Sequence, residues 1–102
     1  MKEIKELDLT KLETVAAGAA GGEAIHFTAN IYKGSNFIDC IRCISYGNTS
    51  ARAIKMAHAN QANVIPEKVH VSVLNGQELD YEKDLAANGV GEGSILIIVI
   101  DE

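Results

Sequence analysis

Hydrophobic and polar residues alternate over positions 25–32, where Ile, Phe, Ala and Ile take the odd positions. Because successive side chains of a strand point to opposite faces, this alternation predicts a strand with one buried face. The sequence Lys-Gly-Ser-Asn at 33–36 is typical of a turn, and residues 37–45 form a second strand-like run. The two runs together predict an N-terminal β-hairpin.

One helix is predicted after this hairpin. Residues 51–62 are rich in alanine, and their apolar residues recur at helical spacing. Residues 46–50 precede them with a turn and several residues of the N-cap type. Asn63 is a typical helix terminator, and Pro66 biases the residue before it away from the helical region. The chain should therefore turn before its next element.

The remaining segments predict three more strands. Valines alternate with other residues over 69–73, and Asn-Gly at 75–76 is a strong hairpin signal. A short strand is expected at 77–79 and a single helical turn at 84–87. Residues 94–100 are apolar on both faces, as expected for a central strand.

The N-terminus has a different pattern. Charged and aliphatic residues mix over the first 16 positions, and the next six are only Ala and Gly. At about 100° per residue, the aliphatic residues fall within an arc of about 140°, which predicts an amphipathic helix that is marginal by itself. They are Ile4, Leu7, Leu12 and Val15. We therefore divide the chain into an amphipathic segment, 1–18, an Ala/Gly linker, 19–23, and a folded domain, 24–102.

The composition excludes several function classes. A chain of 102 residues with 47% hydrophobic content is long enough for one core. Its net charge of −5 and aromatic content of 5% argue against a nucleic-acid partner. The longest apolar run, 95–100, is too short to span a bilayer, so we expect no membrane insertion.

Side chains that carry chemistry are sparse. Cys40 and Cys43 form a CxxC motif, but on an extended strand such residues lie about 10 Å apart on opposite faces, beyond the limit of about 7 Å for a disulfide. We expect one buried and one exposed thiol. His26, His58 and His70 lie on three different elements, and we expect them at the surface or partly buried. We predict no catalytic residue, metal, cofactor or small-molecule substrate.

Four stretches of the sequence resemble ubiquitin-like domains. Ile-Pro at 65–66 matches the Ile-Pro that follows their helix, and residues 74–79 resemble their strand-turn-strand. Residues 85–90 are similar to the loop before their last strand, and residues 91–95 to the entry of that strand. The resemblance extends over about residues 25–100.

This resemblance implies an α+β fold of the β-grasp type, a ββαβββ sheet crossed by one helix, here with a flexible N-terminal extension. The sequence is most similar to the small bacterial ubiquitin-like proteins of type VII secretion loci, which are called YukD-like. The matching motifs specify turns and core positions, so they indicate a fold and leave the function open.

The first 18 residues resemble the double-glycine leader peptides of bacterial precursors that peptidase-containing ABC transporters process. Leaders of that family carry aliphatic anchors at fixed distances before a pair of small residues, and the cut follows the pair. The corresponding anchors here are Leu7, Leu12 and Val15, and the small pair is Ala17 and Gly18. Ala17 departs from the pattern, which has glycine there. A cut after Gly22 would restore a glycine pair but lose the anchor register.

The last strand also predicts a binding surface. If Ile95, Ile97 and Val99 face the helix, the alternate residues face away from it, where ubiquitin-like domains present a recognition surface. Those residues are Leu96, Ile98 and Ile100. A contiguous aliphatic stripe is either an interaction site or is covered within the chain, for example by the N-terminal segment.

We therefore expect a non-catalytic bacterial protein that acts by protein binding, as a precursor recognised through its leader by a transporter's peptidase domain. Such a protein would be cytoplasmic as a precursor and secreted after leader removal. One alternative is an intracellular accessory protein of a type VII-like secretion system. A second is a sulfur carrier, but the chain ends Val-Ile-Asp-Glu and lacks the C-terminal Gly-Gly on which that chemistry depends.

Overall fold

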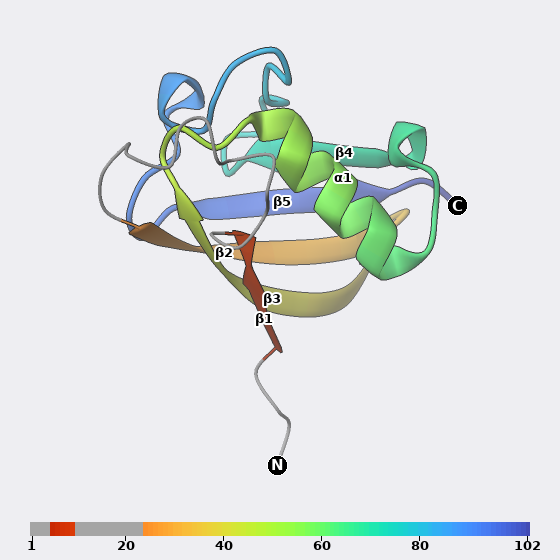
Figure 1. The fold of residues 1–102 in the computed structure, drawn as a ribbon. Helices are drawn as coiled ribbons and strands as arrows, with labels where there is room; N and C mark the ends of the chain where they lie inside the picture. Colours follow the sequence, from red (N-terminus) through yellow and green to blue (C-terminus); the bar gives the residue numbers. More distant parts are fainter. Residues whose placement is uncertain (1–4, 10–23) are drawn as a thin grey trace.

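One helix crosses one face of a five-stranded mixed sheet in this protein (Figure 1). The computed structural model describes residues 5–9 and 24–102. The strands are β1 (Lys5–Asp8), β2 (Ala24–Lys33), β3 (Asn36–Tyr46), β4 (Val69–Val73) and β5 (Ile95–Ile100), and the helix is α1 (Ala51–Ala62). Short 3-10 turns lie at Pro66–Lys68 and Ala86–Asn88. The strand order is β1-β3-β2-β5-β4.

Both parallel pairs of the sheet join strands that are distant in sequence. β1 runs parallel to β3, and β2 runs parallel to β5. The hairpin partners β2 and β3 are antiparallel, as are β4 and β5. β2 and β5 therefore form the centre of the sheet, and β1 and β4 form its edges.

The predicted helix is confirmed, and its ends have the expected chemistry. Ser50 is the N-cap, and its side chain accepts a 3.1 Å hydrogen bond from the Arg52 amide. Asn63 ends the helix in the left-handed conformation, with φ 60°. The buried face of α1 includes Ile54 and His58, both of which point into the core.

The predicted facing of β5 is wrong. Leu96, Ile98 and Ile100 are 0%, 0% and 4% exposed, so they belong to the core and not to a surface stripe. The reason is the register with β2, which places Leu96 beside Ala29 and Ile98 beside Ile31 on the face that α1 covers. An all-apolar strand has no alternation of its own, so its sequence cannot set its facing.

The expected strand at 77–79 is reduced to a single bridge between Ser72 and Glu78. Two backbone hydrogen bonds still hold this segment against β4: Leu79 donates to Val71 at 2.8 Å and Val73 donates to Gln77 at 2.9 Å. The fifth strand of the sheet is instead β1, which comes from the N-terminal segment.

The amphipathic helix expected near the N-terminus is contradicted where the structure describes that segment. Residues 5–8 form β1, and Leu9 directly after it is 1% exposed. Leu7 and Leu9 are two positions apart, a spacing that places both side chains on one face of a strand but not on one face of a helix. Pairing with β3 also supplies partners for the backbone of residues 5–8, whereas a short isolated helix is marginal in water. The leader positions Leu12, Val15, Ala17 and Gly18 lie outside the described residues. The division at 18 and 23 therefore stays a prediction.

Candidate functional site

The sheet face opposite α1 carries an apolar surface that no helix of the described chain covers. In register across the sheet, Phe37 lies beside Tyr32, and Tyr32 lies beside Val99. The rings of Phe37 and Tyr32 meet edge to face, with their centroids 5.5 Å apart. Ile95 and Ile97 extend this row along β5. We call these five residues the outer face.

Exposure of the outer face is greatest at its two ends. Phe37 is 55% exposed and Ile95 is 40% exposed, whereas Tyr32, Ile97 and Val99 are half-buried. Contiguous apolar groups at this level of exposure are typical of protein interaction sites. Aromatic residues are also enriched where binding energy concentrates.

A β-bulge creates the aromatic end of this surface. Ile31 pairs with Asp39, but the next pair joins Tyr32 to Phe37, so Ile38 has no partner on β2. The bulge reverses the facing of β3 at this point. Phe37 consequently shares the face of Tyr32, which simple alternation along β3 would not give.

A polar cluster borders the outer face at β4. His70 pairs with Val99 in register, and its ring nitrogens lie 3.0 Å from an Asp101 oxygen and 3.3 Å from a Glu78 oxygen. The hydrogen bond to Asp101 is the main cause that raises the pKa of His70. Tyr81 donates a 2.5 Å hydrogen bond to Glu78 and thereby lowers the pKa of that carboxyl. These bonds fix the C-terminal end of the chain beside the sheet.

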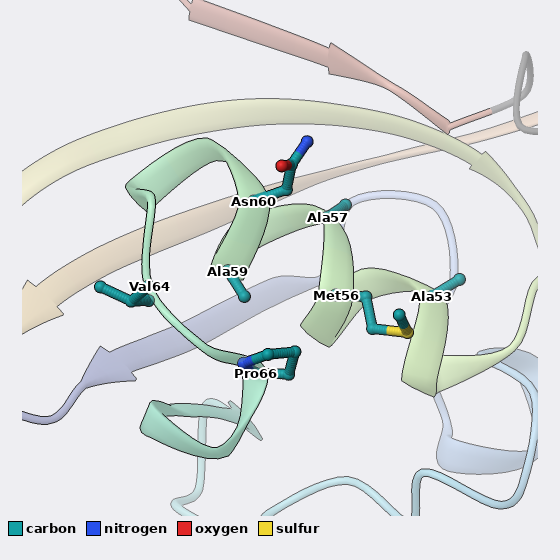
Figure 2. Close-up of a pocket in the computed structure, with 7 residues that line it drawn as sticks. All are labelled: Ala53, Met56, Ala57, Ala59, Asn60, Val64 and Pro66. Carbon is teal, nitrogen blue, oxygen red and sulfur yellow. The ribbon is translucent and has the colours of Figure 1, made fainter.

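A second apolar hollow lies on the helix side of the molecule (Figure 2). Its volume is about 470 Å³, and it lies between α1 and the chain segment that follows the helix. The lining residues are Ala53, Met56, Ala57, Ala59, Asn60, Val64 and Pro66. None of them titrates, so this groove offers apolar contacts and one amide, and no acid, base or nucleophile.

A smaller cavity of about 180 Å³ contains a buried histidine. His58 is 2% exposed, and neither ring nitrogen has a hydrogen-bond partner among the described residues. Burial lowers the pKa of His58 to about 4. Asp39 and Gln61 supply the other polar side chains in the lining. The expectation that His58 lies at the surface or partly buried is wrong, because its helix position faces the core.

The two cysteines lie as predicted. Cys40 is exposed and Cys43 is buried, and both are free. Burial raises the pKa of the Cys43 thiol to about 12, so this group is not a nucleophile at neutral pH.

The three histidines do not converge on one site. His26 lies 3.3 Å from a Glu92 oxygen at one end of β2, whereas His70 belongs to the cluster on β4 and His58 lies inside the core. In the part of the chain that the structure describes, no group of three or more His, Cys, Asp or Glu side chains is placed to hold a metal ion. No helix over these residues is long and apolar enough to cross a membrane.

Sequence patterns did not reveal the residues that form the outer face. The alternate residues of β5, Leu96, Ile98 and Ile100, were predicted in their place, and no role was predicted for Phe37. One signal was available: Tyr32 is on the polar side of the alternating strand at 25–32, so its neighbours across the sheet share that side. Leu9 is not among the four aliphatic residues of the predicted helical arc, yet it is one of the most buried residues.

Solved structures that are similar to this chain include ubiquitin-like domains. An N-terminal ubiquitin-like domain is 16% identical, with a TM-score of 0.65 over 78% of this chain and 76% of that one. A ubiquitin from Caldiarchaeum subterraneum is 15% identical, with a TM-score of 0.62 over 74% and 92% of the two chains. The ubiquitin-like domain of an Arabidopsis thaliana protein is 18% identical, with a TM-score of 0.64 over 79% and 81%.

No protein-family model matches the sequence, and no curated protein matches it either. At 15 to 18% identity, the structural likeness is informative about the fold and not about partners or chemistry. The ββαβββ expectation is confirmed at the level of fold class, with β1 as the fifth strand of the sheet. This chain has the ubiquitin-like β-grasp fold, an α+β mixed sheet crossed by one helix.

Proposed function

We propose that this domain is a non-catalytic binding module that recognises an apolar protein surface through its outer face. The observation that carries the proposal is the continuous row Phe37, Tyr32 and Val99 across three strands, extended along β5. Its centre is apolar and its border at β4 is charged, which is the usual arrangement of a protein interface.

The chemistry of the alternatives is less favourable. Cys43 is buried with a raised pKa, and His58 is enclosed in the core. The larger groove on α1 has no titratable lining residue. Acid–base or nucleophilic catalysis needs such a group in reach of a substrate. The exposed His70 is hydrogen-bonded to Asp101 and Glu78 and lines neither the helix groove nor the cavity at His58. Binding is therefore the function that these surfaces support best.

The test compares two lysine substitutions in the full chain. Ile97→Lys places a charge in the middle of the outer face, and Met56→Lys places the same charge in the helix groove, where Met56 is 53% exposed. Proteins retained by each tagged variant from the native host are quantified by mass spectrometry. We expect Ile97→Lys to lose specific partners about tenfold or more, a loss typical of a charge in an interface core, and Met56→Lys to keep them. Equal retention by both variants would contradict the proposal.

Within this role, we propose that the protein is a precursor, cytoplasmic at first and exported by a peptidase-containing ABC transporter. This proposal rests on the spacing of Leu7, Leu12 and Val15 before Ala17 and Gly18. Leu7 is half-buried in β1 and packs against the core, so the peptidase would have to displace β1 before it could bind this anchor. The alternatives, a type VII secretion accessory and a sulfur carrier, require no cleavage there.

A digest with the cognate transporter's peptidase domain, read by intact mass, tests the precursor role. We expect a cut after Gly18, strong slowing by Leu12→Ala, and faster cleavage of Ala17→Gly. Truncation of an aliphatic anchor typically costs about 2 kcal/mol or more, which is over tenfold in affinity. If both the natural chain and Ala17→Gly stay uncut, the precursor role fails and the accessory role becomes the better account. The outer-face proposal is not affected by that result.

A further inference from the structure

The edge of the sheet beside β3 is filled by a short strand from the chain's own N-terminus. β1 covers four positions of β3, where Leu7 lies beside Cys43 and Asp8 beside Ile44. β3 itself has 11 residues, from Asn36 to Tyr46. Among the described residues, the rest of this edge has no neighbouring strand.

Two leucine side chains of this segment contact the core. Leu9 is 1% exposed and belongs to the hydrophobic core, and Leu7 packs against the same core from a half-buried position. Glu6, which precedes them, is exposed, and Asp8, which lies between them, is half-buried. Two aliphatic side chains two residues apart therefore enter the domain from one edge, in the way that a bound extended peptide fills alternate pockets.

Charge adds a further element of recognition. Glu6 lies beside Arg42 in the parallel register, and both side chains are exposed. Opposite charges on neighbouring strands favour pairing. The edge of β3 therefore matches a segment with an acidic residue followed at once by an aliphatic residue and, two positions later, by a second aliphatic residue.

We propose that β1 is a displaceable cover, and that the β3 edge is a second binding site for an extended segment of a partner protein with this spacing of one acidic and two aliphatic residues. The site adds strand pairing to the proposed outer-face binding and does not depend on it. β1 competes as an intramolecular ligand, so that a partner strand gains access when β1 is removed or outcompeted. Tethered competitors of this kind act at effective concentrations of about a millimolar, which sets the threshold for displacement.

The probe is a labelled peptide with the sequence of residues 1–11, added to the full chain and followed by fluorescence anisotropy. Leu9→Ala weakens the docking of the chain's own β1. Leu79→Ala is the matched control, because it truncates the same kind of side chain at the opposite edge of the sheet. The two leucines are similarly buried: Leu9 is 1% exposed and Leu79 is 5% exposed. We expect Leu9→Ala to bind the peptide about tenfold or more tightly than the natural chain does, and Leu79→Ala to bind like the natural chain.

Amide exchange locates the bound peptide. In Leu9→Ala, amides of residues 41–44 that face β1 should exchange faster, and the peptide should restore their protection. If Leu9→Ala loses the protection of β5 and is therefore unfolded, Leu7→Ala replaces it, since Leu7 is only half-buried. Equal binding by all variants, or equal binding of a peptide with serine at both leucine positions, would overturn the proposal. Either result leaves the Ile97→Lys test of the outer face unchanged.

Discussion

Protonation of His58 should limit the stability of this domain in mild acid. The imidazole is 2% exposed and its ring nitrogens have no partner within the described residues. The folded state therefore holds the ring neutral, with a pKa of about 4, whereas the unfolded chain has the ordinary value of 6.5. The unfolded state binds more protons between these two values, so the free energy of unfolding falls as the pH drops from 6.5 towards 4.

The size of this effect follows from the two pKa values. Lowering the pKa of His58 from 6.5 to about 4 corresponds to a loss of about 3 kcal/mol in the free energy of unfolding once the pH is below both pKa values. At about pH 5 the loss is about 2 kcal/mol. A loss of this size is a large fraction of the stability of a small domain. Near pH 7.5 the contribution of His58 protonation is close to zero.

Urea unfolding of the natural chain and of His58→Leu measures the effect. Leucine removes the titration and the two unpartnered nitrogens, so the variant should be the more stable of the two at neutral pH by about 1 to 3 kcal/mol. The difference should widen by about 2 kcal/mol between about pH 7.5 and about pH 5. Comparison with the variant cancels the titration of groups that do not interact with position 58.

His70→Asn provides a control of opposite sign. The carboxylates of Asp101 and Glu78 raise the pKa of His70, so its contribution to stability is present below pH 6.5 and is lost as the pH rises through the raised value. The effect should be small because the side chain is 38% exposed and solvent screens it.

A difference between the natural chain and His58→Leu that stays constant with pH would refute the burial of a neutral imidazole at position 58.

Three further outcomes follow from the structure. Ile98→Ala should lower the free energy of unfolding by about 2 to 5 kcal/mol, and Ile97→Ala by less than about 1.5 kcal/mol, because only Ile98 is fully buried. Equal losses in urea unfolding would contradict the facing of β5 described above. In the native protein a thiol reagent should label Cys40 and not Cys43, and peptide mapping that finds both labelled at the same rate would contradict the burial of Cys43. Ser50→Ala should lower stability by about 1 kcal/mol through loss of the helix cap, and an unchanged urea midpoint would show that the cap contributes nothing.

Local patterns predicted most of the domain, because alternation and turn chemistry act over a few residues. The hairpin, the helix with its terminator Asn63, and the separate environments of Cys40 and Cys43 were all visible in this way. Each of these features depends on near neighbours in the sequence. The ubiquitin-like motifs then specified how the elements are ordered.

Features that depend on pairing between distant strands were not predictable in the same way. The facing of β5 is set by its register with β2, since its own residues are apolar on both sides. The position of Phe37 depends on a bulge that alternation does not reveal. The strand at residues 5–8 forms because β3 offers an unpaired edge, and a helical periodicity over the same few residues fits the sequence equally well.

Site-specific photocrosslinking in the native host shows whether the outer face is the binding surface. A photoreactive phenylalanine analogue replaces Phe37 on the outer face or Met56 in the groove on α1, which are 55% and 53% exposed. We expect a discrete crosslinked partner from position 37 that is lost when Ile97→Lys is added, and no such product from position 56. A partner captured from position 56 alone, or a product from position 37 that persists with Ile97→Lys, would contradict it.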